Sequence, residues 1–366
     1  MKITQCTSTL YRLPLKRRLS DSRHGILTQF EVVMVRLNTE EGIQGVGYTY
    51  TIGLGGGAIK ALIDDALAPL LIGRDPTEIE ALWEAMWWKL HYVGRGGPVS
   101  FAVSALDLGL WDLLGKKRGE PLWRMLGGHN PQVVPYAGGV DLQFSLEELL
   151  DQTRKNLAAG YRALKMKVGR EDYREDVERV AAVRELIGPD VTLMVDANMQ
   201  WTTSTAISAA RAFAPYELYW FEEPTIPDDF AAHATIQSEG GIPVAAGENL
   251  HTVYEFRHLI EAGGVSFVEP DVSNCGGVTG WMRVANLAYT HNLPTTSHGV
   301  HEIHLQLLAA IPNKSFVECH GFGLERYMKN PPQMIDGVMR AGELPGHGVD
   351  FDWAKLEEHN GRVAPA

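Results

Sequence analysis

The second part of the chain carries eight short apolar runs, and seven of them have an ionisable residue at or near their C-terminal end. The runs are YAGG, ALKMK, LMVDAN, YWFEEP, VAAGEN, SFVEPD, TTSH and SFVECH, and amphipathic segments of helix length separate them. Successive ionisable tips lie 20 to 29 residues apart, which is the length of one strand–helix unit. Eight such units close into a (β/α)8 barrel, whose chemistry lies at the C-terminal ends of the strands. The sequence therefore predicts an α/β fold with a TIM-like barrel over residues 126–325, and the tips at its mouth are Lys167, Asp196, Glu222, Glu248, Asp271, His298 and Glu318.

Two flanking regions lack this repeat. Residues 1–125 contain strand-like runs at 30–37 and 45–51, followed by helical runs at 58–71, 76–91 and 100–117. Strands followed by helices indicate a separate α+β domain. We expect the remaining segment, 326–366, to pack back on that first domain.

Composition and charge narrow the class of partner. The chain has a formal net charge of −12, which argues against nucleic acid or an anionic membrane as the main partner. No uninterrupted apolar run approaches the length of about 18 residues that suggests a membrane span. The three cysteines (Cys6, Cys275 and Cys319) are far apart and odd in number, so they form no disulfide framework. We expect a cytoplasmic protein that binds a small molecule.

Two lysines interrupt the apolar run ALKMKV. Side chains alternate along a strand, so Lys165 and Lys167 share one face. At the edge of an open sheet they would lie in water, but a closed barrel has no edge, and there they point inward. Because each ammonium group disfavours the charge of the other, Lys165 should lower the pKa of Lys167, as should a metal ion nearby. Lys167 is therefore predicted to be a neutral base near pH 7.

Three of the tips are carboxylates on consecutive strands. Asp196, Glu222 and Glu248 would repel one another unless a cation holds them together. Ligand sets made only of oxygen suit a hard divalent ion, and Mg²⁺ with water and substrate completing its shell fits best. The sequence therefore predicts a magnesium site at the barrel mouth.

The later tips add a second base. His298 needs an acid to orient its ring, and Asp271 on the preceding strand is the natural partner. Two bases beside a divalent cation suit removal of the proton α to a carboxylate, with the cation stabilising the enediolate. Burial should keep Glu318 protonated, so that it can donate a hydrogen bond to the same oxyanion.

These motifs resemble those of the enolase superfamily, mandelate racemase subgroup. The resemblance is carried by KMK (165–167), VDAN (195–198), FEEP (221–224), GEN (247–249), PD (270–271), NCGGVTGW (274–281) and SHG (297–299). It implies that residues 1–125 are a capping domain over the barrel. It also implies Asp196, Glu222 and Glu248 as Mg²⁺ ligands, Lys167 and His298 with Asp271 as bases, Lys165 and Glu318 at the substrate carboxylate, and Asn198 at a substrate hydroxyl.

Four further segments resemble acid-sugar enzymes of this subgroup: LSDSRHG (19–25), GYTYTIGLGGG (47–57), HYVGRGG (91–97) and GGVDLQF (138–144). The implied reactions are cycloisomerisation of an anhydro sugar acid of the 3,6-anhydro-L-galactonate type and dehydration of an acid sugar of the galactarate or talarate type. Both begin with α-proton removal and differ in the oxygen that leaves the β-carbon. The first two segments should form loops over the mouth, where Arg23 and His24 are candidate contacts to the substrate.

Three other functions are compatible with parts of the sequence. Racemisation or epimerisation of a 2-hydroxy acid uses the same first step, and a non-catalytic metal- or sugar-acid-binding protein can share the fold. The segment 53–58 (GLGGGA) imitates a dinucleotide fingerprint, but Asp75, about 20 residues on, lies in a turn rather than at a strand end. We expect a homo-oligomer, whose size the sequence does not set.

Overall fold

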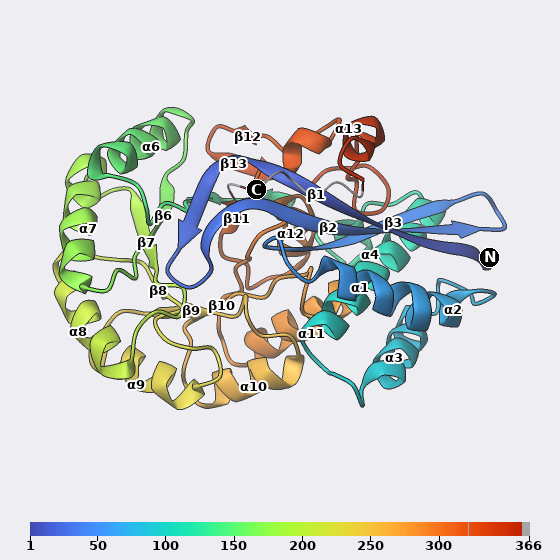
Figure 1. Cartoon of the computed structure of the whole chain (residues 1–366), viewed down its shortest axis with the longest axis horizontal. Helices are drawn as coiled ribbons and strands as arrows, with labels where there is room; N and C mark the ends of the chain where they lie inside the picture. Colours follow the sequence, from blue (N-terminus) through green and yellow to red (C-terminus); the bar gives the residue numbers. More distant parts are fainter. Residues whose placement is uncertain (321, 361–366) are drawn as a thin grey trace.

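The computed structural model describes residues 1–320 and 322–360, and the chain begins with an antiparallel three-stranded sheet. Its strands β1 (Ile3–Asp21), β2 (Gly25–Thr39) and β3 (Gln44–Thr51) pair in chain order. The predicted runs at 30–37 and 45–51 are confirmed as parts of β2 and β3. The 19-residue β1 was not anticipated, because its burial does not follow a regular alternation. The β1–β2 hairpin (dark blue) crosses the barrel in Figure 1.

Helices cover one side of this sheet (Figure 1). The long α4 lies against β3, where Gly47 leaves room for the backbone of the helix: a Cβ there would meet the carbonyl oxygen of Ala105 at 2.0 Å. Only glycine fits such a close approach. The helical elements of this region are α1 (Gly56–Leu62), the π-helical turn η1 (Ile63–Leu67), α2 (Ala68–Leu71), α3 (Ile79–Leu90), α4 (Pro98–Arg118) and α5 (Leu122–Met125).

Helix α4 qualifies the expectation that no segment approaches a membrane span. Among the described residues it is the one helix that is long and apolar enough to cross a membrane, judged by length and composition alone. Most of it is buried between the sheet and the barrel. A helix that is apolar all round is typical of the interior of a large protein as well as of a membrane.

The barrel is a parallel sheet of seven strands in the order β10-β9-β8-β7-β6-β5-β11. An eighth segment closes it through single bridges, with Thr295 between Val268 and Lys314. The predicted seventh run, TTSH, is therefore present as one bridged residue rather than a full strand. The strands are β5 (Pro135–Gly138), β6 (Ala163–Lys167), β7 (Thr192–Asp196), β8 (Phe221–Glu222), β9 (Val244–Ala246), β10 (Phe267–Val268) and β11 (Val317–His320).

Helices alternate with these strands and form the outer layer that Figure 1 shows from green to orange. A capping box opens α6, since Ser145 accepts from the backbone of Glu148 and the Glu148 side chain accepts in return. Helix α7 ends before Gly188. The layer comprises α6 (Leu146–Ala158), α7 (Tyr173–Ile187), α8 (Thr203–Phe213) with η2 (Ala214–Tyr216), α9 (Phe230–Gly240), α10 (Val253–Glu261), α11 (Gly277–Thr290) and α12 (His301–Ala310).

The last described residues lie on the first sheet. The Tyr11 hydroxyl donates to Glu357 Oε1 at 2.7 Å, and Tyr11 also forms a backbone bridge with Asn360. Nearby, the guanidinium of Arg36 lies over the ring of Trp353. The boundaries proposed near residues 125 and 325 remain predictions. The region after β11 contains η3 (Leu324–Tyr327), β12 (Met334–Ile335), β13 (Val338–Arg340), which pairs with β4 (Gln132–Val133), and α13 (Trp353–Glu357).

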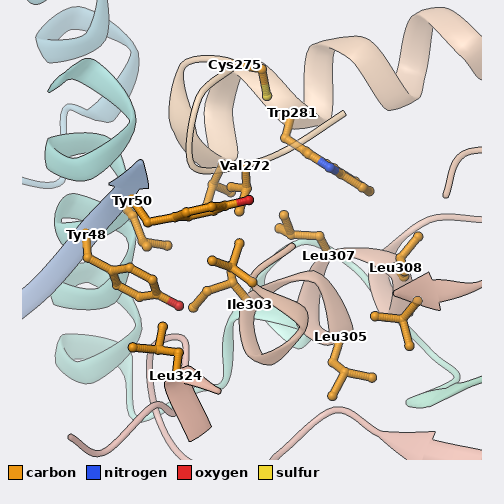
Figure 2. Packing of buried hydrophobic residues seen from close by; sticks show 14 of the residues in the cluster. Tyr48, Tyr50, Val272, Cys275, Trp281, Ile303, Leu305, Leu307, Leu308 and Leu324 are labelled. Carbon is orange, nitrogen blue, oxygen red and sulfur yellow. The ribbon is translucent and has the colours of Figure 1, made fainter. Parts of the chain in front are cut away.

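The first sheet and the barrel share one hydrophobic core. Tyr48 and Tyr50 of β3 point toward Val272 and Ile303 of the barrel, as Figure 2 shows. Both rings are buried, and both hydroxyls bond to barrel carboxylates: Tyr48 to Glu302, and Tyr50 to Asp271 at 3.0 Å. Burial of two aromatic rings, each with a satisfied hydroxyl, fixes the first domain over the mouth of the barrel.

The structure argues against a dinucleotide-binding loop at residues 53–58. Gly56 opens α1, and its backbone N–H donates to Glu31 Oε2 at 2.8 Å. A buried carboxylate therefore occupies the position that a phosphate would take at this helix start. Asp75 accepts the backbone N–H of Thr77 in a turn, far from the role of a ribose ligand.

Candidate active site

Three carboxylates meet at the C-terminal ends of β7, β8 and β9. Asp196, Glu222 and Glu248 each present an oxygen, and the three oxygens lie within 4.8 Å of one another. Burial raises the pKa of Glu222 well above its usual range, and the charges of Asp196 and Glu248 add to this effect. Buried like charges at this spacing need compensation. The all-oxygen donor set fits a hard divalent cation such as Mg²⁺.

Lys165 lies beneath this group and is 3% exposed. Its Nζ contacts Glu222 and lies 2.9 Å from Glu318 Oε1, and it sits over the ring of Tyr136. Burial alone would lower the pKa of Lys165, but Glu222 and Glu318 outweigh it and raise that pKa well above its usual value. Lys165 is thus a fixed cation between Glu222 and Glu318.

Lys167 faces the first carboxylate of the group. Its Nζ donates to Asp196, and its backbone N–H donates to Asp141 Oδ1 at 2.9 Å. Burial works to lower the pKa of Lys167, but the charge of Asp196 outweighs burial and the repulsion from Lys165, and the net pKa lies above the ordinary value. We expected Lys165 and a bound cation to lower this pKa. Lys165 does act in that direction, but the prediction left out the paired Asp196, which outweighs it. The part of the expectation that depends on the cation stays a prediction.

His298 faces the last carboxylate of the group. Its Nε2 lies 3.2 Å from Glu248 Oε2, and its Nδ1 lies 3.0 Å from Asp271 Oδ2. Tyr50 donates a second hydrogen bond to the same Asp271 oxygen. Burial opposes a charge on His298, but Glu248 and Asp271 raise its pKa well above the usual value. Asp271 fixes the ring so that Nε2 faces the carboxylates.

Glu318 corrects another expectation. Its Oε2 accepts the backbone N–H of Gly299 at 2.9 Å, and its Oε1 faces Lys165. Burial alone would raise the pKa of Glu318, but Lys165 outweighs it, and the pKa falls well below its usual range. Glu318 is therefore an ionised acceptor rather than the protonated donor that the sequence suggested.

Asn198 adjoins the carboxylates through the loop after β7. Its backbone N–H donates to Asp196 Oδ1 at 2.7 Å, and its Nδ2 lies 3.3 Å from Asp196 Oδ2. The residue has φ of +40°, an uncommon conformation for a side chain other than glycine. Its buried Oδ1 has no hydrogen-bond partner among the described residues. That free acceptor is available to a substrate hydroxyl.

The tip of the β1–β2 hairpin brings Arg23 and His24 to the barrel. Ser22 Oγ donates to the Ala197 carbonyl at 2.8 Å, and Arg23 donates to the carbonyl oxygens of Met199 and Gln200. The Arg23 guanidinium therefore anchors the hairpin and does not line the cavity. His24 does line it.

A cavity of about 290 Å³ opens beside the carboxylate group. The barrel contributes Glu248, Asp271 and His298, and the first domain contributes His24, Tyr50 and Phe101. Its size suits a small molecule. Sequence reasoning missed Tyr50 and Phe101. The alternation of Tyr48 and Tyr50 in GYTYTIG signals a shared buried face, but no signal marked Phe101.

Two family models cover most of the chain. The N-terminal domain of mandelate racemase / muconate lactonizing enzyme matches residues 10–127, and the enolase C-terminal domain-like family matches residues 148–355. The chain belongs to the enolase superfamily. The division into two matches follows the change from the antiparallel sheet and its helices to the barrel.

This enolase-superfamily chain is similar to named acid-sugar enzymes over its whole length. It is 49% identical to 3,6-anhydro-alpha-L-galactonate cycloisomerase of Streptomyces coelicolor, covering 99% of both chains. It is 34% identical to L-talarate/galactarate dehydratase of Salmonella typhimurium, covering 93% of this chain and 86% of that one. A crystal structure of a racemase from Streptomyces coelicolor with bound magnesium superposes with a TM-score of 0.96 at 47% identity, covering 98% and 99%.

Proposed function

We propose that the protein is a Mg²⁺-dependent enzyme that removes the α-proton of a sugar acid and then expels an oxygen from the β-carbon. One observation carries the proposal: Lys167 and His298 flank the carboxylate group from opposite ends. Lys167 contacts Asp196 on β7, whereas His298 lies beside Glu248, which follows β9. Two bases on either side of a cation site can address the two faces of one α-carbon.

Each side chain has a task in this scheme. Asp196, Glu222 and Glu248 hold the cation, and Lys165 faces the substrate carboxylate. When bound, Mg²⁺ supplies a Lewis acid that stabilises the negative charge of the enediolate. Lys167 and His298 move protons at the α-carbon, and Asp271 keeps the His298 ring oriented.

We further propose that the leaving oxygen is an ether oxygen, as in the ring opening of a 3,6-anhydro-L-galactonate. The support is the higher identity to the named cycloisomerase, 49%, than to the named talarate/galactarate dehydratase, 34%. Racemisation of a 2-hydroxy acid is the second candidate, favoured by the name of the Streptomyces crystal structure. A cytoplasmic homo-oligomer completes the proposal, and the three unpaired cysteines fit a reducing compartment.

A screen of sugar acids tests the proposal. The purified full chain is incubated in D₂O with Mg²⁺ and either 3,6-anhydro-L-galactonate, galactarate, talarate or a simple 2-hydroxy acid, and NMR follows the α-proton and the products. We expect α-proton exchange together with a 2-keto-3-deoxy product from the anhydro acid. Exchange with inversion and no elimination would replace the proposal by racemisation. No exchange with any of them would refute it.

A further inference from the structure

A second Asp–His pair lies at the tip of the β1–β2 hairpin. Asp21 Oδ2 accepts a hydrogen bond from His24 Nδ1 at 2.9 Å, and Asp21 Oδ1 accepts the backbone N–H groups of Arg23 and His24 at 2.9 and 2.7 Å. These three bonds fix the imidazole ring. Within residues 1–320 and 322–360, His24 Nε2 has no hydrogen-bond partner. The free nitrogen is therefore available to a ligand.

The hairpin sets this pair over the active site. His24 lines the same cavity as His298, and the Ser22 and Arg23 side chains tie the tip to the loop after β7. Lys167 lies close enough to influence the pKa of both Asp21 and His24. The hydrogen bond to Asp21 raises the pKa of His24, and because Nδ1 donates to Asp21, the second proton of the charged ring lies on Nε2. The cavity thus contains two histidines that are each oriented by an aspartate, one from each domain.

We propose that His24 is a third catalytic residue, which donates its Nε2 proton to the oxygen leaving the β-carbon. This inference rests on the proposed function. A base takes the α-proton, the Cα–H electron pair becomes the Cα=Cβ bond, and the Cβ–O pair departs with the oxygen. The oxygen takes the proton of His24, and the ring regains one from water. The proton on the base returns to the β-carbon as the enol becomes the keto acid, and the enol O–H proton is released to solvent, which balances the proton that the His24 ring regains.

The reaction itself gives a reason for a third acid. Elimination produces an alkoxide or hydroxide, which is a poor leaving group without a proton, and the residue that donates this proton must face the β-oxygen rather than the α-carbon. A positioned general acid typically accelerates such a step by about 10²–10⁴-fold. His24 comes from the first domain, whereas Glu248 and His298 line the same cavity from the barrel, so a substrate between them can present different atoms to the two histidines.

Changing the leaving group tests this role. The variant His24→Gln and the wild type are assayed with 3,6-anhydro-L-galactonate and with 3-deoxy-3-fluoro-L-galactonate, because fluoride leaves without protonation. We expect ring opening to fall about 10²–10⁴-fold in the variant while fluoride release stays unchanged. If the chain dehydrates galactarate instead, water loss from galactarate replaces ring opening.

Two controls make each outcome decisive. Arg23→Gln changes the neighbouring anchor, so any loss from a displaced hairpin should affect both substrates equally. Exchange of the α-proton in D₂O is followed in every sample. Equal loss of ring opening and fluoride release in His24→Gln would overturn the assignment and make His24 a binding contact, and no loss in either would overturn it too. Absent exchange in the wild type would mean that the proposed function has failed.

Discussion

The two walls of the cavity differ in how their polar groups are held. Behind the barrel wall, Asp196 and Glu222 are fully buried, and each contacts a buried lysine. On the wall of the first domain, His24 is exposed and the neighbouring Leu54 is 85% exposed. A buried charge is expensive unless it is paired, so one change on the barrel wall disturbs several groups. An exposed group is solvated by water, so changes on the other wall should stay local.

The strongest test of this contrast removes one charge from the carboxylate group. Glu248→Gln keeps the shape of the side chain and leaves two negative charges where three stood. We expect loss of measurable Mg²⁺ binding in calorimetry, because hard divalent cations depend on charged oxygen ligands. Chelation of the wild type should abolish turnover and added Mg²⁺ should restore it. Full activity of Glu248→Gln without added metal would contradict the metal assignment.

The second test removes one base at a time. In Lys167→Ala or His298→Asn we expect product formation to fall about 10²–10⁴-fold, the usual contribution of a positioned acid or base. Exchange of the α-proton in D₂O should survive in one of the two variants, because one base remains. Undiminished product formation in both variants, with chemistry limiting the rate, would rule out the pair of bases.

A third test uses acid to probe the barrel wall behind the His298–Asp271 pair. Burial lowers the pKa of His304 to about 4, and its Nε2 accepts the backbone N–H of Val272. Because the unfolded chain protonates near pH 6.5, the stability due to neutral His304 is present above that pH and lost as pH falls toward 4, at up to ~1.4 kcal/mol per pH unit. Urea unfolding at several pH values measures this slope. His304→Gln, which keeps an acceptor, should flatten it, and an unaltered slope would contradict the account.

The smallest effect is expected on the exposed wall. Arg23→Ala removes three hydrogen bonds from the hairpin tip to the loop after β7, while Ser22 still holds the tip. Exposed bonds of this kind contribute about 0.5–1.5 kcal/mol each, and water replaces much of that. We expect a rise in KM of a few fold with little change in kcat, measured by steady-state kinetics. A large fall in kcat would mean that Arg23 does more than anchor the hairpin.

The sequence predicted the barrel well, because each strand tip carries a reactive group at a regular interval. Lys167, Asp196 and Glu222 end their strands as expected. The signs of two pKa shifts could not be obtained in this way. Lys167 and Glu318 each have an opposite charge as their decisive neighbour, Asp196 and Lys165, and both partners come from other strands. Strand alternation shows which residues share a face, but not which of them touch across the barrel.

The β1–β2 hairpin shows a second limit of prediction from the sequence. Nothing in the local pattern of β1 predicts that Ser22, about 20 residues into the chain, reaches the loop after β7. The side-chain pattern of a strand reports burial on its two faces, and here those faces change partners along the strand. Tyr11 lies near the C-terminal helix, whereas Asp21 lies over the cavity. Distant partners of this kind are fixed by the tertiary fold alone.

The closing segment of the barrel has a consequence for how activity appears during folding. Thr295 is its single bridged residue, held by backbone bonds to Asn313 and Ser315 and followed by Thr296 bonding to Val268. His298 lies three residues after Thr295. This base therefore reaches its position only when the barrel is closed at Thr295, where few backbone hydrogen bonds join the neighbouring strands. In a hydrogen-exchange experiment, the backbone amides of Thr295 and Thr296 should be among the first in the barrel to exchange. A partly assembled chain would contain the three carboxylates and the two lysines, but it would lack the second base, His298.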